Sequence, residues 1–305
     1  MLNNILNYRQ LSHNRKMIDK YDLKRSVLSP VGTTALPETK ELPWLDTDNA
    51  MDDLENSRQY KTFSEDIQSQ LRRFVSDGFM ILEKFYDHES ILRHNEEIDH
   101  LRESRKIDFN YSGSKIMDVY RECSWIDNRF FRNQKLMEIF EFIFQKKIIP
   151  FQTIHFIKGS QQKAHSDSIH MSTYPPGYLL AAWTALEDIG MEQGPVYYYP
   201  GSHRLPYVSC EDYNSGNTVW RIGKDSYRNY EQYVERLIEN EGLEPVYFTP
   251  GAGDVLIWHA NLLHGGLEIR GRNLTRRSMV GHYFADDVFC YHEISQRPAL
   301  ISDSE

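Results

Sequence analysis

The segment from residue 246 to residue 284 reads VYFTPGAGDVLIWHANLLHGGLEIRGRNLTRRSMVGHYF and alternates short apolar runs with turns. Pro250-Gly251 separates the first run from the second, and dipeptides of Pro and Gly mark turns. Short apolar runs bounded by such turns are typical of β-strands. The segment therefore predicts three strands, at residues 246–249, 254–258 and 278–284.

The same pattern extends upstream as far as Pro150. Three further runs of strand type lie at residues 151–157, 179–186 and 196–199. Many short strands separated by Gly/Pro turns indicate a β-sandwich or barrel. The fold class that we predict is mainly β with flanking helices.

The flanking helices are predicted between residues 62 and 146. Thr62-Phe63-Ser64-Glu65 matches a capping box, and apolar residues at helical spacing follow it as far as Gly78, which ends the helix. Amphipathic patterns predict two more helices, at residues 88–103 and 134–146.

Outside this core, residues 1–60 are polar, contain three prolines and lack sustained periodicity. We interpret them as a partly irregular extension that wraps the domain or stays partly mobile. Residues 61–290 then form a single domain, and 291–305 form a tail. A polar, Tyr-rich insertion at about 210–243 carries a predicted helix and is more typical of a lid or binding loop than of a core.

Composition excludes several classes of protein. The 35 basic and 44 acidic residues give a net charge of −9, which argues against a nucleic-acid binder. Three scattered cysteines argue against a disulfide framework, and no apolar stretch is long enough for a membrane span or a signal peptide. We expect a soluble, cytoplasmic protein with neither nucleic acid nor membrane as partner, and composition does not predict its oligomeric state.

The triplet His165-Ser166-Asp167 is the first sign of a metal site. In a strand, side chains at positions i and i+2 share a face, so an imidazole and a carboxylate would project together. They would supply two of the three ligands of the facial triad that binds Fe(II). Such triplets are common by chance, so a third ligand is needed from elsewhere in the chain.

His259 and His264 are the candidates for the third ligand, although either also suits a hydrogen-bonded histidine of the core. We favour His264, because the two glycines after it would allow backbone and ligands to approach a metal closely.

Two arginines, Arg276 and Arg277, open the strand predicted at 278–284. A guanidinium there can bind the far carboxylate of a dicarboxylate cosubstrate through two charge-assisted hydrogen bonds. Ser278 shares a face with Arg276 and could donate to the same carboxylate. The alternative is a pair of surface arginines at the end of a strand.

Taken in order, these motifs resemble the phytanoyl-CoA hydroxylase-like family of Fe(II)- and 2-oxoglutarate-dependent oxygenases. The resemblance spans roughly residues 62–285 and rests on His165-Ser166-Asp167, the segments at 182–186, 194–196 and 200–204, the run from Gly253 to Gly265, and the strand after Arg276. It implies a double-stranded β-helix (jelly-roll, cupin-like) core with Fe(II), 2-oxoglutarate and O2 as cofactor and cosubstrates.

The resemblance also implies roles for single residues. His165, Asp167 and His264 match the catalytic metal ligands, since the family tends to place a second histidine five residues before the last one. Arg276 matches the arginine that binds 2-oxoglutarate, and Trp183 matches a tryptophan that lines the cosubstrate pocket or simply packs in the core.

Two departures from the family pattern leave questions open. The segment from His264 to Arg276 is one residue longer than in the members considered, so Arg277 remains an alternative anchor. Gly266 replaces a hydroxyl residue, so one hydrogen bond to the cosubstrate is absent or comes from Ser278. Asp167 is retained, unlike in related halogenases, and hydroxylation or another oxidation with release of succinate and CO2 is therefore expected.

The substrate is expected to be a small organic molecule. Its candidate contacts are His170, Tyr174, Tyr197, Tyr199 and His203, together with Trp220, Arg221 and Lys224 of the insertion. His203 would shape the mouth of the site. The rival interpretations are a jelly-roll protein that binds a ligand without turnover and a cupin-like metal enzyme that does not use 2-oxoglutarate.

Overall fold

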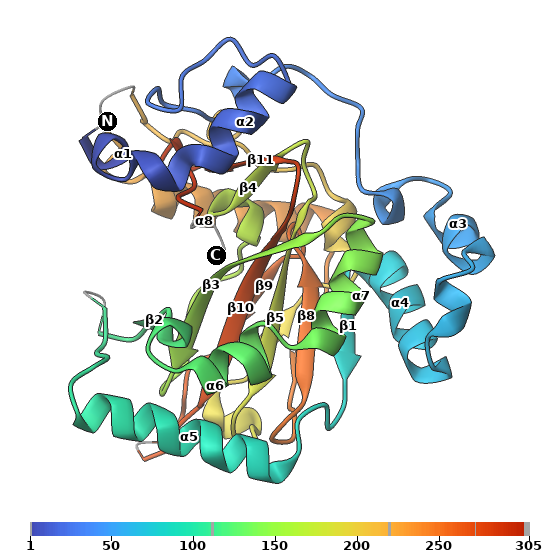
Figure 1. Ribbon diagram of the computed structural model, residues 1–305, viewed down its shortest axis with the longest axis vertical. Helices are drawn as coiled ribbons and strands as arrows, with labels where there is room; N and C mark the ends of the chain where they lie inside the picture. Colours follow the sequence, from blue (N-terminus) through green and yellow to red (C-terminus); the bar gives the residue numbers. More distant parts are fainter. Residues whose placement is uncertain (1, 111–112, 219–220, 272, 302–305) are drawn as a thin grey trace.

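The computed structural model describes residues 2–110, 113–218, 221–271 and 273–301, and its centre is a six-stranded antiparallel sheet (Figure 1). In spatial order the strands are β1 (Phe79–Leu82), β8 (Val255–His259), β5 (Leu179–Ala185), β10 (Ser278–Ala285), β3 (Ile148–Phe156) and β2 (Ile116–Met117). The strands expected from the Gly/Pro punctuation are all present, with ends that differ by at most three residues.

Two three-stranded sheets complete the β structure. One contains β7 (Val246–Phe248), β6 (Val196–Tyr198) and β9 (His264–Gly266), and the other contains β12 (Arg297–Pro298), β11 (Phe289–His292) and β4 (Ser172–Tyr174). Side chains of β6 and β7 pack against side chains of the large sheet in one buried apolar cluster. This two-layered arrangement is that of a jelly roll.

The other face of the large sheet is covered by helices (Figure 1). They are α4 (Glu65–Asp77), α5 (His88–Glu103), α6 (Ser124–Ile126) and α7 (Gln134–Phe144). Their apolar side chains bury against the strands, as the helical spacing predicted. The cap of α4 differs from the prediction, because Ser64 rather than Thr62 accepts the hydrogen bond from the backbone N–H of Ile67.

The N-terminal segment contains α1 (Leu2–Leu6), α2 (Ser12–Lys20) and α3 (Ala50–Asn56) and packs on the domain (Figure 1). The buried amide of Asn14 donates to the carbonyl oxygens of Cys290 at 2.8 Å and Ala299 at 2.9 Å. These bonds join α2 to the strand pair at the far end of the chain.

The insertion folds around α8 (Ser226–Glu241), which has Tyr230 and Val234 on its buried side. Cys123, Cys210 and Cys290 are free thiols. Among the residues that the structure describes, no helix combines the length and the apolar character needed to cross a bilayer.

Candidate metal centre

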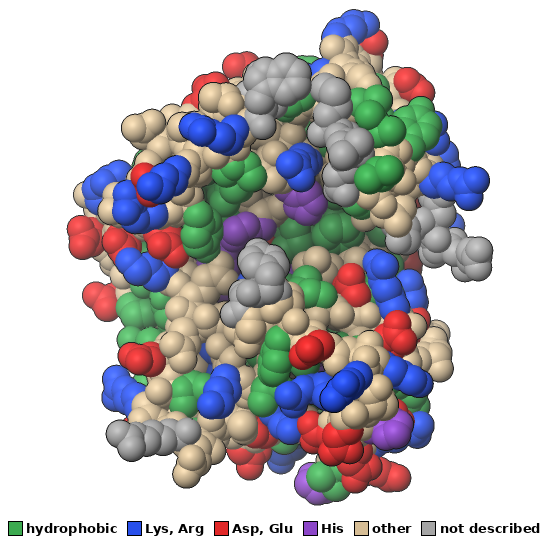
Figure 2. Space-filling model, turned by 90° about the vertical axis from the view of Figure 1, so that its left-hand side faces the viewer, with side chains coloured by type: hydrophobic (Ala, Val, Ile, Leu, Met, Phe, Trp, Pro, Cys, Tyr) green, Lys and Arg blue, Asp and Glu red, His purple; other side chains and the backbone are tan. Residues whose placement is uncertain are grey.

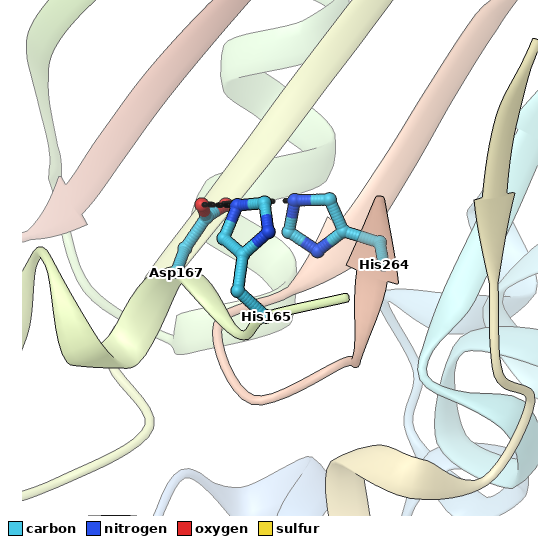
Figure 3. A group of neighbouring side chains, drawn as sticks. All are labelled: His165, Asp167 and His264. Atoms are coloured by element: carbon cyan, nitrogen blue, oxygen red, sulfur yellow. Dashed lines mark ion pairs between the residues drawn. The ribbon is translucent and has the colours of Figure 1, made fainter. Parts of the chain in front are cut away.

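His165, Asp167 and His264 lie together beside the three-stranded sheet of β7, β6 and β9, which contains His264 (Figure 3). Reciprocal backbone hydrogen bonds of 2.9 Å join His165 to His264 and bring the two imidazoles side by side. The Asp167 Oδ1 atom lies 4.0 Å from Nε2 of His165 and 3.7 Å from Nε2 of His264. Within the described ranges, no other three His, Cys, Asp or Glu side chains gather in this way.

The local backbone differs from the strand that the triplet suggested. Asp167 begins a 3-10 turn that runs to Ile169. His165 pairs with His264 of β9 in a single isolated β-bridge. Ser166 is nevertheless extended, with φ −103° and ψ 148°, so the side chains before and after it still point the same way.

Both imidazoles are oriented by backbone carbonyls. Nδ1 of His165 lies 2.8 Å from the Lys163 oxygen, and Nδ1 of His264 lies 3.0 Å from the Leu262 oxygen. Since a carbonyl only accepts, each Nδ1 carries the proton and each Nε2 has a free lone pair facing Asp167. Burial lowers the pKa of His165 well below its usual value, which keeps this imidazole neutral, as a metal ligand must be.

Asp167 is held through its second oxygen. The indole N–H of Trp258 donates to Oδ2 at 2.8 Å, and Nε2 of His282 lies 3.7 Å from the same atom. Burial alone would raise the pKa of Asp167, but His264 and His282 lower it below its ordinary value. The carboxylate is therefore ionised, and its Oδ1 remains directed at the two imidazoles.

His259, the rival third ligand, is fully engaged elsewhere. Its Nδ1 accepts from the backbone N–H of Asn261 at 3.1 Å, so its Nε2 carries the proton and donates to Asp46 at 3.0 Å. Neither nitrogen is left to bind a metal.

The three side chains face a cavity of about 840 Å³ between the sheets. In Figure 2 histidine side chains are visible in the hollowed middle of one face of the molecule. The cavity wall also includes Trp183 of β5, Val280 of β10 and Arg276, which lies two residues before the start of β10. A volume of this size suits a small-molecule ligand.

Arg276 is 2% exposed and forms part of the cavity wall. Its Nη1 donates to the Gly194 carbonyl at 2.8 Å, whereas Nε has no hydrogen-bond partner in the described chain. Burial lowers the pKa of the guanidinium to about 10, so it remains charged at neutral pH. A buried cation with an unused donor and no carboxylate partner among the described residues favours an anionic ligand at this place.

Two glycines make room for the guanidinium. A Cβ at Gly159 would lie 2.2 Å from Cζ of Arg276, and a Cβ at Gly266 would lie 3.0 Å from its Nη1 and 3.2 Å from Oγ of Ser160. Gly266, which replaces a hydroxyl residue in the family pattern, thus leaves space that is bordered by the hydroxyl of Ser160.

Arg277 faces the opposite side of β10. Its Nη2 donates to both carboxylate oxygens of Asp99 on α5, at 2.9 and 3.0 Å. Its charge already has a partner, and its side chain is absent from the cavity wall. The geometry therefore separates the two arginines that the sequence left as alternatives.

The other predicted contacts are divided between the cavity and the rest of the molecule. His170 and Trp183 line the cavity. Ser278 is completely buried and lies 3.5 Å from the Arg276 carbonyl, but it is not part of the cavity wall in the described residues. The expectation that its hydroxyl faces the same ligand as Arg276 gains no support from this position.

The remaining substrate candidates lie outside the cavity wall. Tyr174 borders a second cavity of about 500 Å³, Tyr197 and Tyr199 pack against each other, and His203 packs against His259. In the insertion, Arg221 and Lys224 do not reach the wall, and Trp220 lies outside the described residues. Sequence spacing placed these side chains near the metal motifs, but their directions depend on the fold.

Sequence reasoning did not identify several residues of the site. Trp258 and His282 secure Asp167, and Ser160 and Lys115 line the cavity. The insertion contributes Tyr230, whose hydroxyl accepts from the Ser166 backbone N–H at 2.9 Å, and Tyr227, which lines the cavity. Only Trp258 carried a hint, because a buried indole N–H usually requires an acceptor.

The jelly-roll core brings two histidines and one carboxylate together. This arrangement places the protein in the class of jelly-roll proteins with a candidate facial-triad metal site. Within that class, the chain belongs to the phytanoyl-CoA dioxygenase family, whose family model, Phytanoyl-CoA dioxygenase (PhyH), matches residues 74–278.

Curated relatives support this assignment over part of the chain. The chain is 27% identical over 131 residues to the peroxisomal phytanoyl-CoA dioxygenase of Bos taurus and 28% identical over 134 residues to that of Rattus norvegicus. The matches cover 42% and 43% of this chain and 35% of each relative. The matched region thus spans about a third of the length of those relatives.

Solved structures share the fold at low identity. The non-heme alpha ketoglutarate dependent carbocyclase SnoK superposes with a TM-score of 0.61 at 15% identity, covering 81% of this chain and 96% of that chain. EctD from S. alaskensis with 2-oxoglutarate and 5-hydroxyectoine gives a TM-score of 0.59 at 16% identity, covering 80% and 85%. These likenesses confirm the predicted jelly-roll fold.

Proposed function

We propose that the protein is an Fe(II)- and 2-oxoglutarate-dependent dioxygenase that oxidises a C–H bond of a small organic molecule. The observation that carries the proposal is Arg276, a buried cation with an unpartnered Nε in the same cavity as the His165, Asp167 and His264 cluster. A metal site alone would not require such an arginine. A dicarboxylate that binds a metal at one end and a guanidinium at the other explains both.

The residues present fit both groups. Two imidazoles and one carboxylate are the donor set typical of Fe(II) oxygenases. The space beside Arg276 is lined by Gly159 and Gly266, where any Cβ would crowd the guanidinium. That space fits the far carboxylate of 2-oxoglutarate. The structure of EctD with 2-oxoglutarate and 5-hydroxyectoine shares this fold.

Each side chain then has a defined task. His165, Asp167 and His264 would hold the iron, while Trp258 and His282 keep Oδ2 of Asp167 engaged so that Oδ1 is presented to the metal. Arg276 would bind the far carboxylate of 2-oxoglutarate. When bound, iron and 2-oxoglutarate would supply the oxidising chemistry together with O2, one oxygen atom of which would end in succinate and the other in the hydroxylated product, with release of CO2.

Part of the cavity wall beside the metal cluster is apolar. Trp183 and Val280 of the large sheet and Val196 of β6 form this apolar part. Because Arg276 and Asp167 are themselves buried, their electrostatic interactions with ligands would be stronger than at an exposed surface. We propose hydroxylation as the outcome, because the carboxylate ligand Asp167 is retained.

The first experiment needs no substrate. Fe(II) and 2-oxoglutarate are added to the purified protein without oxygen, and the visible charge-transfer band of the chelated complex is recorded. We expect a saturable band, which Asp167→Ala abolishes and Arg276→Ala shifts to higher 2-oxoglutarate concentration. Arg277→Ala is the matched control and should leave the titration unchanged.

The opposite results identify the rivals. A folded, iron-loaded protein without a band would contradict the proposal and favour a metal enzyme that does not use 2-oxoglutarate. A normal band without succinate release for any substrate in a broad screen would favour a ligand-binding protein.

A further inference from the structure

The helix of the insertion, α8, packs directly behind the metal cluster. Its buried side chains Tyr230 and Val234 belong to one apolar cluster with Ala164, Ile169 and Leu263. Ala164 and Leu263 immediately precede the two histidines of the metal cluster, and Ile169 follows its aspartate by two positions. Because successive side chains of an extended chain point to opposite faces, the histidines face the cavity while the residues before them face α8.

The hydroxyl of Tyr230 contacts the residue that separates two of the candidate ligands. The backbone N–H of Ser166 donates to this hydroxyl at 2.9 Å, and the two residues are 1% and 0% exposed. Burial raises the pKa of Tyr230 to about 12, so the phenol keeps its proton at neutral pH. It can therefore accept from the backbone and also donate from its own O–H.

That O–H is the first donor in a chain of hydrogen bonds with a defined direction. The Ser168 hydroxyl donates to Oδ1 of Asn261 at 3.2 Å, because an amide oxygen only accepts. Ser168 then accepts from the Ser166 hydroxyl at 2.8 Å, and Ser166 accepts from Tyr230 at 3.4 Å. The Asn261 amide is fixed in turn by two backbone carbonyls, to which it donates at 3.2 and 2.7 Å. The turn that carries Asp167 is thus held between α8 and Asn261.

Tyr227, about one helical turn before Tyr230, contacts the same segment on the other side of His165. Its hydroxyl accepts from Nε2 of Gln162 at 2.5 Å. Residues three apart share a face of a helix, so both phenols reach the segment from the same side. On its other side, the Gln162 carbonyl accepts from the backbone N–H of Gly266 at 2.9 Å. The segment is therefore fixed between β9 and α8.

We propose that α8 positions the metal-binding segment, and that Tyr230 and Tyr227 are positioning residues for His165 and Asp167. This inference rests on the proposed function, which makes those two side chains ligands of iron. A ligand that is held in place before the metal arrives loses less conformational freedom when the metal binds. The affinity for the metal should therefore depend on the two phenol hydroxyls.

The test measures metal binding without turnover. Co(II), which accepts the same imidazole and carboxylate ligands as Fe(II), is titrated into the purified protein, and its visible spectrum reports affinity and ligand geometry. Tyr230→Phe keeps the ring but leaves the buried Ser166 N–H without its acceptor. We expect the Co(II) affinity to fall by about tenfold, the lower end of the effect of losing an indirect partner of a metal ligand. Tyr227→Phe should cause a smaller loss.

Hydrogen exchange in the metal-free protein locates the effect. In Tyr230→Phe, the backbone amide protons of residues 162–169 should exchange faster than in the wild type, because local opening of this segment costs less free energy. Exchange in α5, on the far side of the large sheet, should be unchanged. This measurement needs neither metal nor substrate.

Two further substitutions in α8 separate positioning from stability. Tyr233→Phe removes the hydroxyl of a partly buried tyrosine that packs in the same apolar cluster, and it should leave the Co(II) titration unchanged. Val234→Ala removes buried methyl groups beside Tyr230, so it should lower the unfolding temperature while the Co(II) affinity is retained.

A wild-type Co(II) titration in folded Tyr230→Phe overturns the inference, and so does an equal loss of affinity in Val234→Ala. If Tyr230→Phe does not fold, Tyr227→Phe decides, and an unchanged titration for that variant overturns the inference.

The two proposals fail separately. Co(II) binding that depends on Tyr230, in a wild-type protein that forms no visible band with Fe(II) and 2-oxoglutarate, contradicts the dioxygenase and supports the positioning role. A normal band that Tyr230→Phe forms at the same metal concentration supports the dioxygenase and contradicts the positioning role. A wild-type protein that binds no Co(II) contradicts both.

Discussion

The two ends of the cavity differ in how completely the protein satisfies its own polar groups. At the metal end, His165 and His264 each donate to a backbone carbonyl, and Asp167 accepts from Trp258. At the other end, the buried Arg276 keeps an unused Nε and has no carboxylate partner in the described residues. One end is oriented by the fold alone, and the other is incomplete without an anion.

This difference predicts that the free energy of binding has a different origin at the metal end and at the arginine end of the cavity. Ligands oriented in advance lose little conformational entropy when the metal binds. The arginine end carries an unfavourable charge until a carboxylate arrives, so cosubstrate binding should stabilise the whole domain. Single substitutions can disrupt one end of the cavity at a time.

The largest effect is expected from Asp167→Ala. Removing the only carboxylate of the cluster should abolish iron retention and turnover, measured by metal analysis and succinate release. Asp46→Ala is a matched control, because Asp46 faces His259, whose nitrogens are engaged elsewhere. Iron retention by Asp167→Ala, or its loss in folded Asp46→Ala, would place the metal at another set of residues.

Next comes the arginine pair. Arg276→Met should weaken 2-oxoglutarate binding by roughly a hundredfold, the value of a strong charge-assisted contact. The unliganded protein should be no less stable, since the variant removes a buried charge that has no carboxylate partner in the described part of the chain. Calorimetric titration and thermal unfolding with and without 2-oxoglutarate measure both quantities.

Arg277→Met should do the reverse. Its partly exposed ion pair with Asp99 contributes up to about 1 kcal/mol to the free energy of unfolding. Stability should therefore fall slightly while the affinity for 2-oxoglutarate stays unchanged. If Arg277→Met loses the cosubstrate and Arg276→Met keeps it, the assignment of the two ends is wrong.

A smaller effect is expected from Trp258→Phe, which removes the hydrogen bond to Oδ2 of Asp167 but keeps an aromatic ring in the core. Fe(II) affinity should fall by about 10- to 100-fold, the usual effect of losing a partner of a metal ligand. Trp125→Phe, at the outer helix α6, should leave it unchanged. Equal metal affinity in both variants would show that the metal end does not depend on this hydrogen bond.

The smallest effect is expected from Gly159→Ala. Its Cβ would overlap Cζ of Arg276 at 2.2 Å, so the guanidinium must shift and 2-oxoglutarate affinity should fall by about tenfold, or roughly 1.4 kcal/mol. Gly251→Ala is the control, since its nearest neighbours lie at an ordinary 3.8 Å. Unchanged affinity in the first variant would mean that the arginine end tolerates displacement.

Local patterns predicted the elements of this fold well. The 88–103 helix has the predicted bounds, and the strands follow the Gly/Pro turns, because hydrophobic periodicity and turn chemistry are local properties. The cap at Ser64 instead of Thr62 shows their limit. Two hydroxyl residues so close together both suit a cap, and the packing of the helix decides between them.

The candidate site was predictable only in part. The order of motifs selected three side chains that the fold does bring together, and their role as metal ligands stays a prediction. The choice between Arg276 and Arg277 required the register of β10, since a shift of one residue exchanges the two faces of a strand. Trp258 and Lys115 meet the cavity through pairings between distant segments, which no local pattern encodes.

The bonds of Asn14 to Cys290 and Ala299 have a consequence for folding kinetics. The first of these pairs is separated by 276 positions along the chain, and the backbone N–H of Cys290 returns a hydrogen bond to Asn14. Closing so long a loop is entropically costly and raises the contact order, which slows folding. During synthesis α2 would emerge long before β11. The apolar side of α2, including Met17, would therefore remain unpacked until Phe289 and Tyr291 of β11 have been synthesised.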